Sequence, residues 1–211
     1  MADIAVVDYG MGNLRSVQQA LRTVAPNASI VVTDDPHEVA QASRVVFPGQ
    51  GAMPDCMREL DARGLRAAVL EAAHNKPFLG ICIGLQMLFE HSAEGNIPGL
   101  GILKGSVVRF ASNLRDEQGN KLKVPHMGWN QVHHNEHPLW DNIAQDARFY
   151  FVHSYYVQPQ DVQLAQATSS YPQPFTCAVA RDNLFAVQFH PEKSQSAGLT
   201  LLRNFVSWDP V

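Results

Sequence analysis

Apolar runs alternate with amphipathic helical patterns along the first ninety residues. Apolar side chains at 14, 17, 21 and 24 mark one face of the first predicted helix. Strands alternating with helices are typical of parallel βαβ units, so the pattern predicts a three-layer α/β/α sandwich with a mainly parallel central sheet. The predicted strands are 3–8, 29–33, 44–47 and the first half of 77–90, and the predicted helices are 14–24, 36–42, 54–63, 65–74 and the second half of 77–90.

The pattern changes to short strands and turns after residue 90. Alternating residues at 101–110 and 121–132, around a polar turn at 115–120, indicate an antiparallel subsheet added to the main sheet. The remaining predictions are a loop at 95–101, strands at 148–153, 162–168, 175–181 and 184–189, and a closing amphipathic helix at 196–208 that packs through Leu199, Leu202, Phe205 and Val206.

Length and composition indicate one buried core. A chain of 211 residues, 45% hydrophobic and 17% charged, is long enough for one domain and short for two, so we expect a single domain over 1–211. The net charge of −4 is scattered and provides no basic footprint for nucleic acid or a membrane surface. Without a signal-peptide pattern or a membrane-spanning run, we expect a cytoplasmic protein.

Neither a metal nor a cofactor is expected. The three cysteines, an odd number without metal-ligand spacing, indicate one reactive thiol and two packing residues rather than disulfides or zinc. A histidine-rich patch lacks a carboxylate or cysteine at fitting spacing. A dinucleotide motif starting at Gly10 and Gly12 fails because it needs glycine where Arg15 stands, and no P-loop occurs. The cysteines are Cys56, Cys82 and Cys177, and the patch is His133, His134 and His137.

Cys82 is the candidate nucleophile. It follows an apolar run, precedes a helical pattern and is flanked by Gly80 and Gly84, which is the thiol version of a nucleophile elbow. Its place at a helix start favours the thiolate, and the amide of Ile83 becomes one donor for an oxyanion. The alternative is a buried core cysteine, but flanking glycines weaken both strands and helices and therefore favour the elbow.

His190 and Glu192 are the candidate base and its orienting acid. They follow the strand predicted at 184–189, and Pro191 biases His190 toward extended geometry, in which residues two apart project to the same side. Alone, such a pair is more often a solvated loop pair. Together with Cys82 it predicts a Cys–His–Glu triad for nucleophilic catalysis.

These motifs resemble the class I glutamine amidotransferases, and within them the glutaminase subunits of imidazole glycerol phosphate synthases. The resemblance spans essentially the whole chain. It lies in G-I-C-I-G-L-Q (80–86), H-P-E (190–192), D-Y-G-M-G-N-L-R-S-V (8–17), P-G-Q-G (48–51), H-M-G-W-N (126–130) and H-S-Y-Y (153–156).

The resemblance implies hydrolysis of L-glutamine to glutamate and ammonia through a glutamyl thioester on Cys82. It assigns the second oxyanion donor to the 48–51 loop, where we expect the amide of Gln50 or Gly51 to serve. It also implies that glutamine contacts Gly49, Gln86, His153, Ser154 and Tyr155.

The resemblance further implies a heterodimer with a (β/α)8-barrel cyclase subunit. Ammonia becomes non-nucleophilic ammonium in neutral water, so it needs a protected path to a docked synthase. Trp129, Asn130 and Lys193 flank the predicted catalytic segments, and we expect them at that interface. Core packing is the alternative for Trp129.

Three other functions stay open at this point. The chain could serve anthranilate or aminodeoxychorismate synthase, it could be a thiol peptidase or esterase with the same elbow, or it could be a non-catalytic binding module. The intact Cys82, His190 and Glu192 argue against the last of these.

Overall fold

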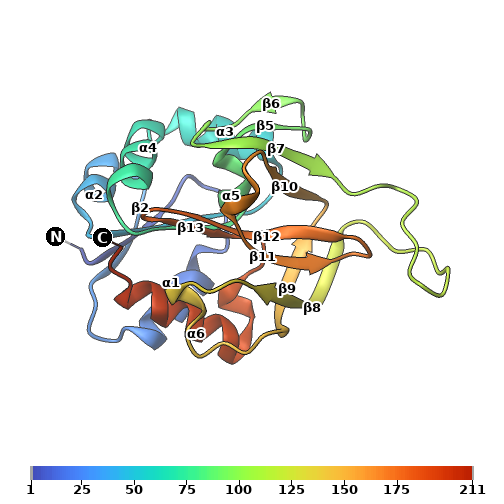
Figure 1. The fold of residues 1–211 in the computed structure, drawn as a ribbon. Coiled ribbons are helices and arrows are strands. Elements are labelled where there is room, and N and C mark those ends of the chain that lie inside the picture. Colours follow the sequence, from blue (N-terminus) through green and yellow to red (C-terminus); the bar gives the residue numbers. More distant parts are fainter. Residues whose placement is uncertain (1, 211) are drawn as a thin grey trace.

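A mixed sheet of 13 strands runs through residues 2–210, the part of the chain that the computed structural model describes (Figure 1). Residues 1 and 211, the ends of the predicted single domain, lie outside the described residues. One half of the sheet is parallel, in the order β2-β1-β3-β4-β13. Its strands are β1 (Ile4–Val7), β2 (Ile30–Thr33), β3 (Arg44–Gly49), β4 (Phe78–Cys82) and β13 (Leu184–Val187).

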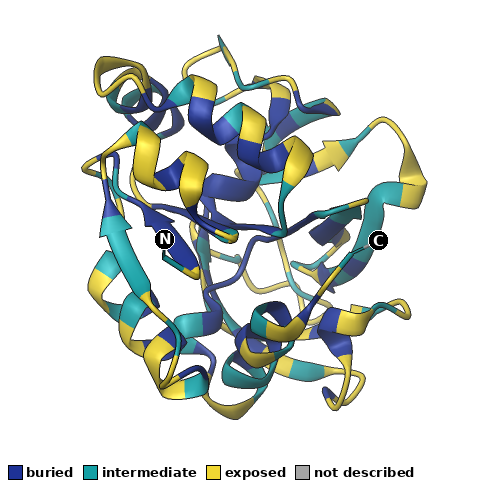
Figure 2. Ribbon diagram, turned by 90° about the vertical axis from the view of Figure 1, so that its left-hand side faces the viewer, coloured by how far each residue is buried: buried dark blue, intermediate teal, exposed yellow. Residues whose placement is uncertain are grey.

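Helices cover both faces of the parallel half, which confirms the predicted α/β/α layering. Figure 1 shows α1 and α6 on one side and α2, α3 and α4 on the other. Figure 2 shows that the helices turn buried residues inward and exposed residues outward. Since both faces are covered, β1, β4 and β13 are buried along their whole length. The helices are α1 (Leu14–Val24), α2 (Pro36–Gln41), α3 (Met53–Ala62), α4 (Arg66–Asn75), α5 (Ile83–Met87) and α6 (Gln195–Ser207).

The other half of the sheet is mainly antiparallel. From β13 it continues through β12, β10 and β7 to β5 and β6, and β11, β8 and β9 form a branch from β12. The strands are β5 (Phe89–Ser92), β6 (Ile97–Pro98), β7 (Leu103–Arg109), β8 (His126–His134), β9 (Ala147–His153), β10 (Tyr155–Pro159), β11 (Ala165–Ser170) and β12 (Pro174–Arg181), and the 3-10 turns are η1 (Pro138–Trp140), η2 (Val162–Leu164) and η3 (Pro191–Lys193).

The helix predicted after Cys82 is shorter than its apolar spacing suggested. It ends at Met87, Leu88 is its C-cap, and Phe89 begins β5, which pairs with β7. Leu88 and Phe89 are both fully buried, and a short apolar run does not distinguish a buried strand from a buried helix. The prediction of helix for Phe89 was therefore wrong.

The predicted antiparallel subsheet is present in the second half, where the strand neighbours had not been predicted. The segments 101–110 and 121–132 do not form a hairpin, because β7 pairs with β10 and β5, whereas β8 pairs with β9 and β11. The predicted loop 95–101 contains β6, the predicted strand 162–168 begins as η2, and β10 was missed. In α6, Leu201 is buried, whereas Leu199 and Val206 are only half-buried.

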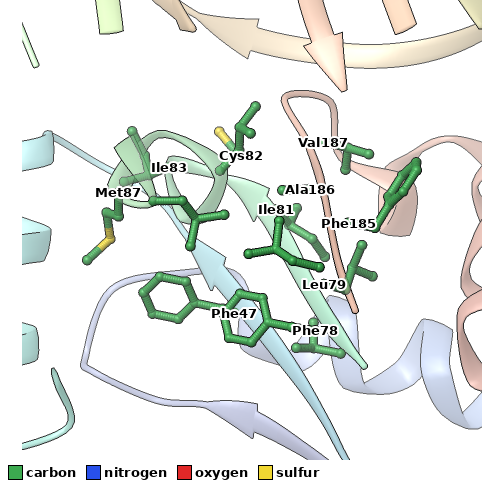
Figure 3. Packing of buried hydrophobic residues seen from close by; sticks show 14 of the residues in the cluster. Phe47, Phe78, Leu79, Ile81, Cys82, Ile83, Met87, Phe185, Ala186 and Val187 are labelled. Atoms are coloured by element: carbon green, nitrogen blue, oxygen red, sulfur yellow. The ribbon is translucent and has the colours of Figure 1, made fainter. Parts of the chain in front are cut away.

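Two glycines allow β4 and the start of α5 to lie close to the neighbouring strands (Figure 3). A Cβ on Gly80 would lie 2.9 Å from the Cβ of Ala186 in β13, and a Cβ on Gly84 would collide with the carbonyl oxygen of Phe47 in β3. Figure 3 shows Cys82 at the end of β4, beyond the apolar side chains that surround the strand. The turn from β4 to α5 is thus packed tightly on both sides.

Candidate active site

Cys82 occupies a strained turn at the carboxyl end of β4. Its backbone angles are φ 56° and ψ −111°, a region that residues with a Cβ rarely adopt, and it is 4% exposed. α5 begins at the next residue, so the amide of Ile83 belongs to the first turn of a helix. The elbow places the thiol at the sheet edge where ligands bind in open α/β sheets.

His190 and Glu192 lie next to this edge because β13 runs parallel to β4. Nδ1 of His190 is 2.9 Å from Oε1 of Glu192, and their side chains are 5% and 1% exposed. His190 itself is extended, as expected before a proline, with φ −102° and ψ 96°. The extended geometry does not continue to Glu192, since Pro191 starts η3, and this short turn brings the carboxylate back to the ring. The backbone amide of His190 donates to the carbonyl oxygen of Tyr150 in β9, which anchors the turn.

The charges of Cys82 and Glu192 favour the protonated form of His190. Burial alone would lower the pKa of the imidazole, but the negative charges of Cys82 and Glu192 together raise that pKa to about 10. Among the described residues, Nε2 of His190 and Oε2 of Glu192 have no hydrogen-bond partner. The unbonded Nε2 therefore remains free for a proton that moves in the cavity.

Cys82 and His190 share a cavity of about 310 Å³. Every predicted oxyanion or substrate residue lines it except Gly49, which lies beside Cys82 in the β3–β4 pair. The lining residues are Gln50, Gly51, Cys82, Ile83, Gln86, Glu94, Pro125, Val152, His153, Ser154, Tyr155 and His190.

The loop after β3 contributes Gln50 and Gly51 to the cavity. The carbonyl oxygen of Gln50 accepts from the Cys56 thiol, with a sulfur–oxygen distance of 3.6 Å. Because a trans peptide points its N–H opposite to its carbonyl, the amide of Gly51 points away from Cys56. Gly51 has φ +107°, a conformation that suits glycine.

Two functional candidates were missed by sequence reasoning. Glu94 lines the cavity, and its Oε2 accepts from the amide of Met53 at 2.9 Å. Gln188 directs Nε2 toward the sulfur of Cys82 at 3.8 Å and accepts from Nε2 of Gln86 at 2.9 Å. Glu94 follows a short strand and Gln188 lies in an apolar run, and no local spacing relates either residue to the cysteine.

The predicted interface residues separate into two groups. Trp129 is 42% exposed, and its ring lies 6.1 Å from that of Tyr150, which Lys193 also approaches, with Nζ 6.0 Å from the ring centroid. Asn130 lies on the opposite face of β8, where its Nδ2 donates to the carbonyl oxygen of Ser170. Trp129 and Lys193 thus meet on one aromatic ring, and the Asn130 side chain turns away from them.

The remaining cysteines and histidines have structural surroundings. Cys56 and Cys177 are buried free thiols, and burial raises the pKa of each, to about 11 for Cys56. His134 stacks on Trp140 at 4.7 Å. Within residues 2–210, no three His, Cys, Asp or Glu side chains form a group that could hold a metal ion, and none of the helices is long and apolar enough to cross a membrane.

Comparison with known proteins identifies the class. The family described as glutamine amidotransferase class-I matches residues 5–208. The chain therefore belongs to the class I glutamine amidotransferases, as the elbow and the His–Glu turn had indicated.

Relatives point to one kind of subunit within this class. "Imidazole glycerol phosphate synthase subunit HisH" of Nitrosospira multiformis is 70% identical over 100% of both chains. The subunit of the same name from Neisseria meningitidis is 55% identical over 97% of this chain and 99% of its own. The resemblance to this subunit family, predicted from the motifs, is confirmed.

More distant structures share the fold alone. PurLQS from Thermotoga maritima has a TM-score of 0.69 at 19% identity and covers 97% of this chain and 98% of its own. The glutaminase domain of Trypanosoma brucei CTPS, with bound acivicin, has a TM-score of 0.63 at 18% identity and covers 100% of this chain and 96% of its own.

Proposed function

We propose that this chain is the glutaminase subunit of an imidazole glycerol phosphate synthase. It hydrolyses L-glutamine to glutamate and ammonia, and a cyclase subunit uses the ammonia to form imidazole glycerol phosphate and an aminoimidazole carboxamide ribotide in histidine biosynthesis. The observation that carries the proposal is the strained Cys82 facing a cavity that it shares with the free Nε2 of His190. The high identity to HisH subunits supports the particular synthase.

In the first step, the Cys82 thiolate attacks the carboxamide carbon of glutamine. The negative oxygen that forms is stabilised by the Ile83 amide and a second amide from Gln50 or Gly51, and one such donor is typically worth about 3 kcal/mol. His190 then gives its Nε2 proton to the departing ammonia, leaving a glutamyl thioester on Cys82.

Charge coupling explains how His190 changes from acid to base. The Cys82 charge is one cause of the raised pKa of His190, and formation of the thioester removes that charge. Burial, which lowers the pKa, then counts for more, so His190 remains neutral after it has given its proton to the ammonia. Neutral His190 next takes a proton from water, which attacks the thioester and releases glutamate, while Glu192 stabilises the imidazolium formed.

The cavity provides groups for the amino-acid end of glutamine. We assign the Glu94 carboxylate, which lines the cavity, to the α-ammonium group, because one of its oxygens is not used by the hydrogen bond from the Met53 amide. Backbone amides at Ser154 and Tyr155 are assigned to the α-carboxylate. Oε1 of Gln86 is a buried acceptor without a partner among the described residues, and it suits an N–H donor of the substrate.

The partner is a (β/α)8-barrel cyclase subunit bound as a heterodimer. Exposed Met127 and Trp129, beside Lys193, offer an apolar surface with a positive charge next to the catalytic turn. Docking there would shield ammonia from water on its way to the cyclase. We assign the single domain 1–211 to this role in the cytoplasm, without nucleic acid, membrane or cofactor.

Glutamate release from glutamine tests the proposal, measured with and without the purified cyclase and its nucleotide ligand. We expect release to depend on both. Cys82→Ala should abolish glutamine-dependent synthesis and leave the cyclase's ammonia-dependent synthesis intact. Stimulation by anthranilate or aminodeoxychorismate synthase instead would assign a different synthase, and peptide hydrolysis without glutamine turnover would contradict the proposal.

A further inference from the structure

Two buried histidines outside the catalytic triad form a hydrogen-bonded pair at the cavity wall. His126 in β8 and His153 in β9 lie directly opposite each other in the antiparallel ladder. Nδ1 of His126 is 2.9 Å from Nε2 of His153, and the residues are 4% and 5% exposed. His153 lines the cavity, yet the proposed reaction uses neither ring.

The outer end of the pair determines which nitrogen of His126 is protonated. The Asn130 amide is oriented by two backbone groups: its Oδ1 accepts from the N–H of Gln131 at 2.8 Å, and its Nδ2 donates to the carbonyl oxygen of Ser170 at 2.9 Å. Nδ2 of Asn130 therefore faces Nε2 of His126, at 3.2 Å, as a donor. Nε2 of neutral His126 must then be the bare acceptor, and its proton lies on Nδ1.

The inner end gives the same assignment independently. Nδ1 of His153 is 2.8 Å from the carbonyl oxygen of Tyr155, which can only accept. The proton of His153 therefore lies on Nδ1, and its Nε2 accepts from Nδ1 of His126. All bonds run in one direction, from Asn130 through both rings to Tyr155.

Aromatic packing holds both rings and excludes water. The His126 ring stacks between Tyr171 and Phe151, with centroid distances of 4.2 and 5.1 Å, and the His153 ring lies 5.1 Å from Phe110. Burial lowers the pKa of His126 to about 4 and that of His153 to about 3. Both rings are therefore neutral at neutral pH, as the bond directions require.

The Tyr155 carbonyl, on which the chain of hydrogen bonds ends, also contacts Gln86, which lines the cavity. The Tyr155 carbonyl also accepts from Nε2 of Gln86 at 3.1 Å, and the same Nε2 donates to Oε1 of Gln188 at 2.9 Å. Both N–H groups of Gln86 are thus used by acceptors. The amide must present Oε1 as its free end, and that atom is the buried acceptor without a partner among the described residues.

We propose that His126 and His153 are positioning residues for glutamine binding, which hold the Tyr155 carbonyl and, through it, the orientation of the Gln86 amide. This inference rests on the proposed function and deepens it. The bond direction is maintained by backbone groups at both ends, so the rings act as a rigid link rather than as acids or bases. Loss of the link allows Gln86 to rotate and present its NH2 group.

Kinetics of two substitutions at His126 test the link in the complex with the cyclase. His126→Phe retains the ring packing and removes the Nδ1 donor, whereas His126→Asn places an amide donor near the Nδ1 position and loses the ring. We expect Phe to raise KM for glutamine about 10-fold with kcat within about 2-fold, and Asn to raise KM less. His133→Gln, an exposed histidine on the same strand, is the matched control and should leave KM unchanged.

A purely structural role makes a different pattern. If the His126 ring serves only to pack, both substitutions should lower the melting temperature and the fraction of active protein, and Asn should do so more than Phe. KM for glutamine would then stay unchanged in both variants. Unchanged KM in His126→Phe, or a larger rise in His126→Asn than in His126→Phe, would overturn the inference. Absence of glutamate release by the wild-type complex would instead overturn the proposed function, and the substrate role with it.

Tautomers can be observed without any activity assay. Two-bond ¹H–¹⁵N correlation spectra of histidine-labelled protein should show His126 and His153 neutral at pH 7, each protonated at Nδ1 and bare at Nε2. A proton on Nε2 of either ring would contradict the directed chain.

Discussion

Nδ1 of His190 lies 2.9 Å from Oε1 of Glu192, and both side chains are almost completely buried. A charge-assisted hydrogen bond in such surroundings is strong, and it places the ring so that Nε2 reaches the cavity that Cys82 also lines. Glu192 thus orients His190, the proposed general base, and helps to raise its pKa.

Replacing the acid by its amide should separate charge from shape. Glu192→Gln keeps the volume but removes the charge and can stabilise the wrong His190 tautomer, so we expect kcat of glutaminase to fall by on the order of 10²-fold or more. The pKa of His190 should also fall, measured by histidine NMR titration. Glu71→Gln, on an exposed helix position, is the control. Full activity in Glu192→Gln would remove Glu192 from the mechanism.

The positive φ of Cys82 predicts an unusual stability order. Glycine in a buried strand usually costs about 0.5–1 kcal/mol relative to alanine, but at φ 56° the alanine Cβ is strained. We expect Cys82→Gly to be more stable than Cys82→Ala by about 1 kcal/mol in denaturant unfolding. The same two substitutions at Cys177, buried in β12, should show the ordinary order. If the glycine and alanine variants rank in the same order of stability at both positions, the result would argue against strain at the elbow.

Close approach of β4 and β13 predicts a rescue. Gly80→Ala brings its Cβ to 2.9 Å from that of Ala186, which should cost about 1–3 kcal/mol of unfolding free energy. Adding Ala186→Gly removes the opposing methyl group. The double variant should therefore be more stable than the sum of the single effects by about 1 kcal/mol. Strict additivity would mean that the backbone, rather than this contact, absorbs the added methyl.

The neutral histidine pair should make the protein sensitive to acid. The pKa of His126 is about 4 and that of His153 about 3, against 6.5 in the unfolded chain, so below pH 6.5 the unfolded state holds more protons. The unfolding free energy contributed by these two neutral rings is then fully present above pH 6.5 and is lost as pH drops toward 4. The slope is up to about 1.4 kcal/mol per pH unit from each ring. His126→Phe should show a shallower fall between pH 6.5 and 4 in urea unfolding. An unchanged slope would show that the rings are not neutral in the fold.

The exposed face of β8 should govern partner binding. Met127 is 62% exposed and Trp129 is 42% exposed, and truncating a central aromatic at an interface typically costs about 2 kcal/mol or more. We expect Trp129→Ala to weaken cyclase binding by about 30-fold in calorimetry, with the isolated subunit equally stable. Val162→Ala is the matched control, since Val162 is 80% exposed outside this face. Unchanged affinity in Trp129→Ala would move the interface elsewhere.

Local patterns sufficed for the parallel half of the protein. The apolar runs and helical spacing of the first 82 residues predicted the order and approximate bounds of four strands and four helices, because each element buries a continuous stripe or run. The elbow was recognisable from a local pattern too, since the tight packing of β4 against β13 requires glycine at 80 and that of α5 against β3 requires glycine at 84.

Local patterns failed where pairing is decided by distant partners. The alternation in 101–110 and 121–132 is typical of strands but does not specify their neighbours: β7 pairs with β10, about 50 residues later, whereas β8 pairs with the next strand, β9. The register of β8 on β9 places His126 opposite His153, and no spacing in the sequence relates these two residues.

The sequence by itself determined the class of fold and pointed to the candidate nucleophile and the candidate His–Glu pair, because each signal depends on residues within a few positions of one another. Only the tertiary structure decided that Glu94 and Gln188 join the cavity and that two buried histidines link β8 to Gln86. These relationships arise from strand order and register, which are set by the packing of the whole sheet rather than by any one segment.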